Sequence, residues 1–164
     1  MADPTPAERS ALAMIEKLED PARLRNLVEN ARRTGSKLVE AAAFRRLCRV
    51  QPANAPDTLE HDLWQSIHAL EEMLRDERGR TVRLSRTRQK IARDGEAKTA
   101  ADLALKPTPS EGFAMLLERG HPELSFEAVV LRHPDAFDDD VRRAAATRLA
   151  AFDLDPDQFT PGGT

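Results

Sequence analysis

The stretch TLEHDLWQSIHALEEMLRDERG, residues 58–79, is the part of the chain that decides its fold class. Large apolar side chains recur every three or four residues in it, at Leu59, Leu63, Ile67, Leu70 and Leu74. This spacing places them along one face of an α-helix, because an α-helix has 3.6 residues per turn. Gly79 is a typical helix stop. The pattern therefore predicts one long helix over about 58–78.

Residues typical of helix starts and ends also occur on both sides of this stretch, where they bound shorter segments. Thr5-Pro6-Ala7-Glu8 combines a capping residue, a proline at the first helical position and a capping-box glutamate. Further short helices are expected over 85–93 and 97–105, and the last one begins at Asp138–Asp140. No segment gives a convincing strand pattern. The sequence predicts an all-α fold of eight or nine mostly short helices around the long central helix at about 58–78.

The chain of 164 residues is 40% hydrophobic, which is enough for a modest core. We expect an N-terminal helical unit over 1–50 and a second helical unit over 58–153, with the loop at 51–57 as the boundary. Residues 154–164 are rich in proline, glycine and aspartate and are expected to form a flexible tail. A single domain containing all of these helices remains the alternative.

Several function classes are excluded or disfavoured by what the sequence lacks. Its single cysteine, Cys48, rules out an intramolecular disulfide, and we expect it to be buried on the apolar face of its helix. No apolar run approaches 18 residues, and the first 13 residues lack the pattern of a secretory signal. The nucleotide-binding glycine motifs and the G-x-S-x-G motif are absent. We therefore expect a soluble, cytoplasmic protein that is not an enzyme, has no cofactor and does not bind membranes.

The charge of the chain is unevenly distributed. Its formal net charge is −3, but residues 75–106 carry 10 basic and 5 acidic side chains, for a local charge of +5. The segments before and after carry −2 and −6. Arginine outnumbers lysine 20 to 5, which is typical of a GC-rich coding sequence and is equally compatible with selection for planar phosphate-binding groups. A positive middle segment in an acidic chain is the feature that points to a partner.

A basic stretch from Arg78 to Arg93 holds seven cations and no acidic residue. On a helix Arg83, Arg86, Lys90 and Arg93 would share one side, where like charges repel unless an anion lies between them. Phosphate groups are natural candidates for that anion. The sequence thus predicts a non-enzymatic accessory or regulatory protein that contacts DNA or RNA phosphates through six residues, namely Arg80, Arg83, Arg86, Arg88, Lys90 and Arg93.

Two alternatives stay open for this basic stretch. Its charges could be neutralised within the molecule by the acidic C-terminal third, for example by the cluster at Asp138–Asp140. The chain could also be a helical protein–protein adaptor, or associate with itself, without binding nucleic acid. A helix-turn-helix with its turn at Gly95 fits poorly, since 97–105 offers few polar side chains to read bases. No aromatic residue interrupts the stretch, so base stacking is not expected.

The histidines are weaker candidates. His61, Gln65, His68 and Glu72 share one helix face, which we expect to be an exposed polar surface rather than a metal site. His121 and His133 each precede a proline and an acidic residue, as expected of residues at helix C-termini. No metal site is predicted from these residues.

Overall fold

Helix α4, Leu59–Arg78, is the long helix of the computed structural model, which describes residues 2–162. The Thr58 hydroxyl caps its first turn by accepting a hydrogen bond from the His61 N–H. Gly79 ends the helix in the left-handed conformation, at φ 66°, where a Cβ atom would be strained. The long helix predicted over 58–78 is therefore confirmed.

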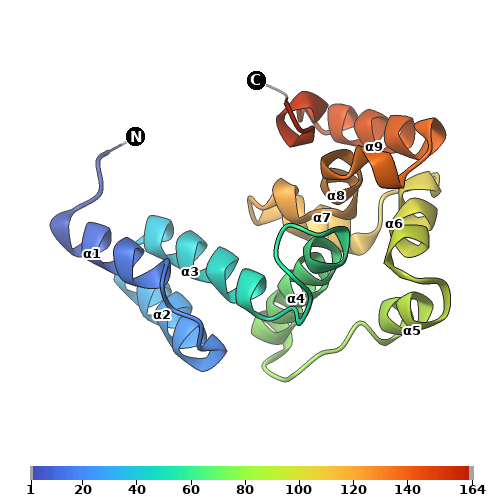
Figure 1. Ribbon diagram of the computed structural model, residues 1–164. Helices are drawn as coiled ribbons and strands as arrows, with labels where there is room; N and C mark the ends of the chain where they lie inside the picture. Colours follow the sequence, from blue (N-terminus) through green and yellow to red (C-terminus); the bar gives the residue numbers. More distant parts are fainter. Residues whose placement is uncertain (1, 163–164) are drawn as a thin grey trace. The chain divides into compact units, whose positions relative to one another are not determined.

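The described residues form an all-helical fold without strands (Figure 1). They contain nine α-helices and three short 3₁₀ helices, so the predicted fold class is confirmed. None of these helices combines the length and the apolar character needed to cross a bilayer. The α-helices other than α4 are α1 Pro6–Ile15, α2 Pro21–Thr34, α3 Lys37–Val50, α5 Ser85–Asp94, α6 Glu96–Leu105, α7 Glu111–Glu118, α8 Phe126–Arg132 and α9 Asp139–Ala151. The 3₁₀ helices are η1 Pro122–Leu124, η2 Pro134–Ala136 and η3 Pro156–Phe159.

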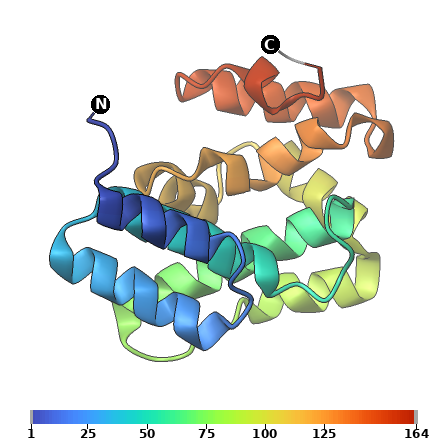
Figure 2. The same cartoon turned by 60° about the vertical axis from the view of Figure 1, so that its left-hand side comes forward.

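The chain divides into two compact units, Met1–Ala53 and Asn54–Thr164, and this boundary falls within the loop at 51–57. In the first unit α2 and α3 form a helical hairpin, and α1 packs against α3 (Figure 2). The Glu8 carboxylate completes the capping box of α1 and also accepts a hydrogen bond from the Ser36 hydroxyl, at 2.6 Å. Cys48 is fully buried in this unit, as predicted.

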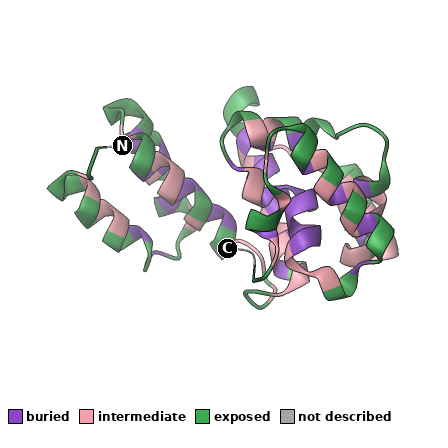
Figure 3. Ribbon diagram, turned by 90° about the horizontal axis from the view of Figure 1, so that it is seen from above, coloured by how far each residue is buried: buried purple, intermediate pink, exposed green. Residues whose placement is uncertain are grey.

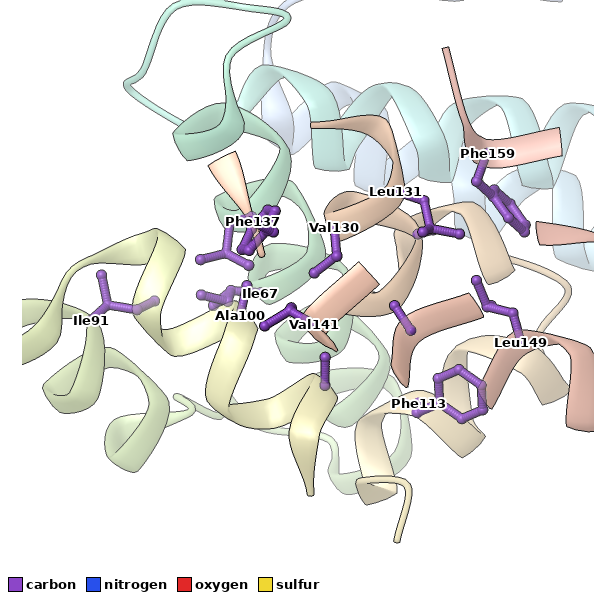
Figure 4. Close-up of a cluster of buried hydrophobic side chains, with 14 residues drawn as sticks. Ile67, Ile91, Ala100, Phe113, Val130, Leu131, Phe137, Val141, Leu149 and Phe159 are labelled. Carbon is purple, nitrogen blue, oxygen red and sulfur yellow. The ribbon is translucent and has the colours of Figure 1, made fainter. Parts of the chain in front are cut away.

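The second unit is organised around α8, whose residues Ala128, Val129 and Val130 have no exposed surface. Helices α4, α6 and α9 all pack against it, and buried positions gather inside the unit (Figure 3). The core combines side chains from helices far apart in the chain, such as Ile67 of α4 and Leu149 of α9 (Figure 4). Burial of these apolar groups is the main force that holds α4 to the C-terminal helices.

A buried ion pair joins three helices of the second unit. Arg148 of α9 contacts Glu127 of α8 at 2.8 Å, and both side chains are less than a tenth exposed. The same guanidinium donates hydrogen bonds to the Leu103 and Lys106 carbonyls at the C-terminal end of α6. The Leu103 carbonyl also accepts the Lys106 N–H, at 3.4 Å, so Arg148 adds side-chain hydrogen bonds to the C-terminal end of α6.

The structure corrects the expectation of a flexible tail for residues 154–162, while residues 163 and 164 of that predicted tail lie outside the described residues. Pro156–Phe159 form η3, and the Asp155 carboxylate caps it by accepting a hydrogen bond from the Asp157 N–H. Phe159 is 8% exposed and belongs to the apolar core of the second unit. The composition of the segment is that of a loop, but one buried aromatic ring is enough to anchor it.

The structure also corrects the expected exposed face of α4. His61 is 1% exposed, although it shares a helix face with the half-buried Gln65, His68 and Glu72. The buried surface of α4 therefore extends beyond its apolar stripe. Helical spacing alone could not show this burial.

We predict that Phe159→Ala lowers the free energy of unfolding of the protein by roughly 3–5 kcal/mol, the usual cost of emptying a buried phenyl site. Gln158→Ala, at the exposed neighbouring position, serves as the control and is expected to change it by less than about 0.5 kcal/mol. Urea unfolding followed by circular dichroism measures both values. Equal stabilities of the two variants would contradict the placement of Phe159 in the core.

Candidate nucleic-acid interface

The basic stretch begins where α4 ends. After Gly79 the chain runs through residues 80–84 without regular secondary structure and then enters α5 at Ser85 (Figure 1). The Leu84 N–H donates a hydrogen bond to the Glu71 carboxylate at 3.0 Å, which attaches the start of α5 to α4. Arg83 therefore precedes the helix. The expected row of four cations along one side of a helix is not formed.

Arg88 is held inside the fold by a bidentate ion pair with Glu71. Its Nε and Nη2 atoms each lie 2.7 Å from a carboxylate oxygen, and its guanidinium lies 5.0 Å from the centre of the Trp64 ring. Burial opposes ionisation of Glu71, but hydrogen bonds from Arg88 and the Leu84 N–H outweigh it and hold the Glu71 pKa below its ordinary value. Arg88 is thus a structural residue that positions α5.

Lys90 and Arg93 also have carboxylate partners. The Lys90 ammonium lies 3.0 Å from Asp94 and 2.7 Å from Asp102, and so connects α5 to α6. Arg93 contacts Asp94 at 3.2 Å, but its side chain remains 70% exposed. Hydrogen bonds from Arg93 and Lys90 lower the pKa of Asp94 to about 2. Asp94 is therefore a carboxylate at neutral pH and neutralises part of this charge.

None of the described residues in the acidic C-terminal third pairs with the six predicted cations. The carboxylates that face Arg88, Lys90 and Arg93 come instead from 71–102. The expected alternative of pairing with Asp138–Asp140 is wrong, because Asp139 and Asp140 bind arginines of their own helix, Arg142 and Arg143.

Three of the six predicted residues are left with their charge unneutralised. Arg80, Arg83 and Arg86 are exposed, and within residues 2–162 they form no hydrogen bond or ion pair. Arg78, at the last position of α4, is in the same state. These four arginines lie within nine positions of one another, on the C-terminal turn of α4, the segment 80–84 and the first turn of α5.

The N-terminal end of α5 adds to the positive character of this region. Its capping position is Leu84, which has no side chain able to accept a hydrogen bond from the first turn. Free amide groups and the helix dipole give a helix N-terminus a partial positive charge that favours anions. The neighbouring Ser85 and Thr87 carry hydroxyl groups. Arginines, uncapped amides and hydroxyls together are the groups that bind phosphate oxygens.

Sequence reasoning missed the two α4 residues that shape this region, Glu71 and Trp64. Glu71 is 9% exposed and lies 17 positions before its partner Arg88. Trp64 donates a hydrogen bond from its indole nitrogen to Glu96 at 3.2 Å, and so lies beside the basic stretch without belonging to it. Nothing in the local pattern of α4 shows that either residue faces α5. Their contacts with Leu84 and Arg88 form only in the folded protein.

A second polar cluster lies where α8 meets the start of α4. His133, the C-cap residue of α8, has its Nε2 atom 2.7 Å from the Asp62 carboxylate, which Arg132 also contacts at 3.3 Å. The pair borders an open hollow of about 640 Å³. Within residues 2–162 no three histidine, cysteine or acidic side chains are arranged to hold a metal ion. His133 thus stands at a helix end, as expected, and in addition connects two helices.

Comparison of the chain with known protein families, with curated proteins and with solved structures gives no significant match. The assignment of this surface therefore depends on its own geometry and charge.

We predict that the Glu71 carboxylate makes the stability of the protein fall at acid pH. A carboxyl group whose folded-state pKa is lowered stabilises the fold above its unfolded pKa, and this contribution is lost as the pH falls through the folded value. Below about pH 4.5 the free energy of unfolding should therefore decline more steeply in the wild type than in Glu71→Gln. At pH 7 the variant should be less stable by roughly 1–3 kcal/mol.

Glu77→Gln is the control for this measurement, because the Glu77 carboxylate is 49% exposed and its pair with Arg119 lies at the surface. Denaturant unfolding of the three proteins between pH 3 and pH 7 provides the comparison. If Glu71→Gln and the wild type lose stability in parallel, Glu71 does not hold α5 through its charge.

Proposed function

We propose that this protein is a non-enzymatic accessory or regulatory protein that binds the phosphate groups of DNA or RNA through the segment from Arg78 to Arg86. The observation that carries the proposal is the set of exposed arginines at 78, 80, 83 and 86, which have no acidic partner in residues 2–162. Concentrated, unpaired positive charge in a chain of net charge −3 calls for an anionic ligand.

The ion pairs around α5 support this division of roles. Arg88 and Lys90 position the helix against α4 and α6, while Arg80, Arg83 and Arg86 remain available to a ligand. The neighbouring carboxylates of Glu71, Asp94 and Asp102 are neutralised by these pairs, which reduces their repulsion of an approaching phosphate. Guanidinium groups suit this purpose, since they bind phosphate oxygens in a bidentate manner.

The affinity of such a surface should depend steeply on salt, because each neutralised phosphate releases a counterion. Four contacts to duplex DNA correspond to a slope of about −3.6 in log K against log salt concentration, or a loss of about 100-fold between 50 and 200 mM salt. Fluorescence anisotropy with labelled DNA and RNA measures this slope.

We predict that the triple charge reversal Arg80→Glu/Arg83→Glu/Arg86→Glu abolishes measurable binding at 50 mM salt. Its control reverses the same number of charges on exposed side chains elsewhere, in Lys17→Glu/Arg33→Glu/Arg143→Glu, and should bind within about threefold of the wild type. Both variants have the same net charge. Equal loss in the two would mean that overall charge, rather than this surface, governs binding, and would overturn the site.

A second candidate function, a protein–protein adaptor, has one observation in its favour. Leu105 and Phe152 are 50% and 45% exposed and border a hollow of about 480 Å³ between the end of α6 and α9. Exposed apolar side chains beside a hollow are typical of protein-binding surfaces. If the chain associates with itself here, light scattering will give a mass of twice 18.3 kDa, and Leu105→Asp will return it to 18.3 kDa. A monomeric wild type would contradict self-association.

A further inference from the structure

The exposed face of α5 carries side chains of the types that read DNA bases. Resting on the proposed function, we infer that α5 enters the major groove of duplex DNA and contacts base edges through Arg86, Gln89 and Arg93. On such a duplex Arg86 contacts a base instead of a phosphate, and the arginines before it, Arg78, Arg80 and Arg83, bind the phosphates that flank the groove. This adds a ligand class, duplex DNA, and a sequence-reading role to a surface proposed above only for its charge.

The burial pattern of α5 separates its residues into two faces. Ile91 is 6% exposed and belongs to the apolar core of the second unit, and Leu84 packs against the same core. Arg88 forms an ion pair with α4, and Lys90 forms one with α6. The exposed residues recur at helical spacing on the remaining face, and they are Ser85, Arg86, Gln89, Ala92 and Arg93. Successive turns of one helical stripe therefore point to solvent.

The chemistry of this stripe matches the major groove. Arginine forms bidentate hydrogen bonds with guanine, glutamine does so with adenine, and an alanine methyl contacts the thymine methyl group. The stripe contains no acidic residue. Asp94, at the end of the helix, is half-buried and bound by Lys90. Arg93 also contacts Asp94, but its exposed ion pair can open for a base without leaving that carboxylate unpaired.

The geometry of the helix favours duplex DNA over other nucleic acids. Its ten residues span about 15 Å, and the B-DNA major groove, about 12 Å wide, admits an α-helix. The major groove of an RNA duplex is too deep and narrow for side chains to read. Because Glu71 and Asp102 brace the helix on both sides, the readers would be presented in a fixed orientation. The N-terminal end of α5, beside Arg80 and Arg83, would lie nearest the backbone.

Gly95 determines how α5 is presented. It separates α5 from α6 at φ 87° and ψ 168°, a conformation that is essentially restricted to glycine. The chain therefore turns within one residue, and α6 can support α5 through Lys90 and Asp102 without covering the exposed stripe. The first helix of the pair, rather than the second, is the reader here, in contrast to a helix-turn-helix.

The experiment is selection of bound duplexes from a random-sequence DNA library by the full chain, followed by anisotropy titrations of the enriched sequence. We expect one enriched motif with G·C and A·T positions. Gln89→Ala should bind that sequence about tenfold to a hundredfold more weakly and lose its preference at one A·T pair, because a bidentate base contact discriminates by that factor. Its salt slope should not change, because glutamine releases no counterion.

Two matched variants separate base reading from charge and from folding. Arg86→Lys keeps the charge but not the bidentate geometry, so it should lose preference at one G·C pair with an unchanged salt slope. Gln158→Ala, an exposed glutamine of η3, should bind like the wild type.

The outcomes distinguish this inference from the proposed function. Binding of all duplexes without an enriched motif, or with Gln89→Ala equal to wild type, overturns base reading and leaves phosphate binding intact. Equal or tighter binding of an RNA duplex or a single strand of the same sequence does the same. Failure to bind any of these nucleic acids at 50 mM salt overturns the proposed function itself.

Discussion

The position of the basic region depends on one group, the carboxylate of Glu71. It accepts three hydrogen bonds, one from the Leu84 backbone and two from the Arg88 guanidinium. A buried carboxylate is costly unless it is paired, and the start of α5 supplies the partners. The chain therefore leaves α4 at Gly79, passes through five residues without regular secondary structure, and returns so that its next helix begins beside Glu71. This attachment fixes where the start of α5 lies relative to α4, and so determines which of its cations face solvent.

This attachment divides a uniform-looking run of cations into two groups. Arg88 forms an ion pair with Glu71 of α4, and Lys90 forms one with Asp102 of α6. The Arg88 guanidinium also lies over the Trp64 ring. Arg80, Arg83 and Arg86 are exposed, and they form no ion pair within residues 2–162. A flexible basic tail could bind phosphate with all of its charges, but it would lose conformational entropy on binding. A braced helix gives up some of its charges and presents the others in one arrangement.

Sequence patterns were reliable wherever local physics decides the outcome. The ends of α4, the capping box at Thr5 and the short helices on either side of Gly95 follow from nearest-neighbour chemistry, and each is found where expected. The same patterns were wrong where a distant contact overrides composition. Phe159 is buried in a segment whose composition predicts a loop, and His61 is buried on a helix face whose pattern predicts an exposed polar surface. The residues that bury these two side chains cannot be predicted from the spacing of residues along a helix.

The sequence by itself determined the helices, their order and the existence of a positive segment, because helix propensity, capping and net charge are properties of neighbouring residues. Only the tertiary structure decided which cations are free. Arg88 and Arg86 are equivalent in the sequence, two positions apart, yet one is held by a carboxylate 17 positions away and the other faces solvent. Coulomb attraction depends on distance in space, and folding, not spacing along the chain, sets that distance.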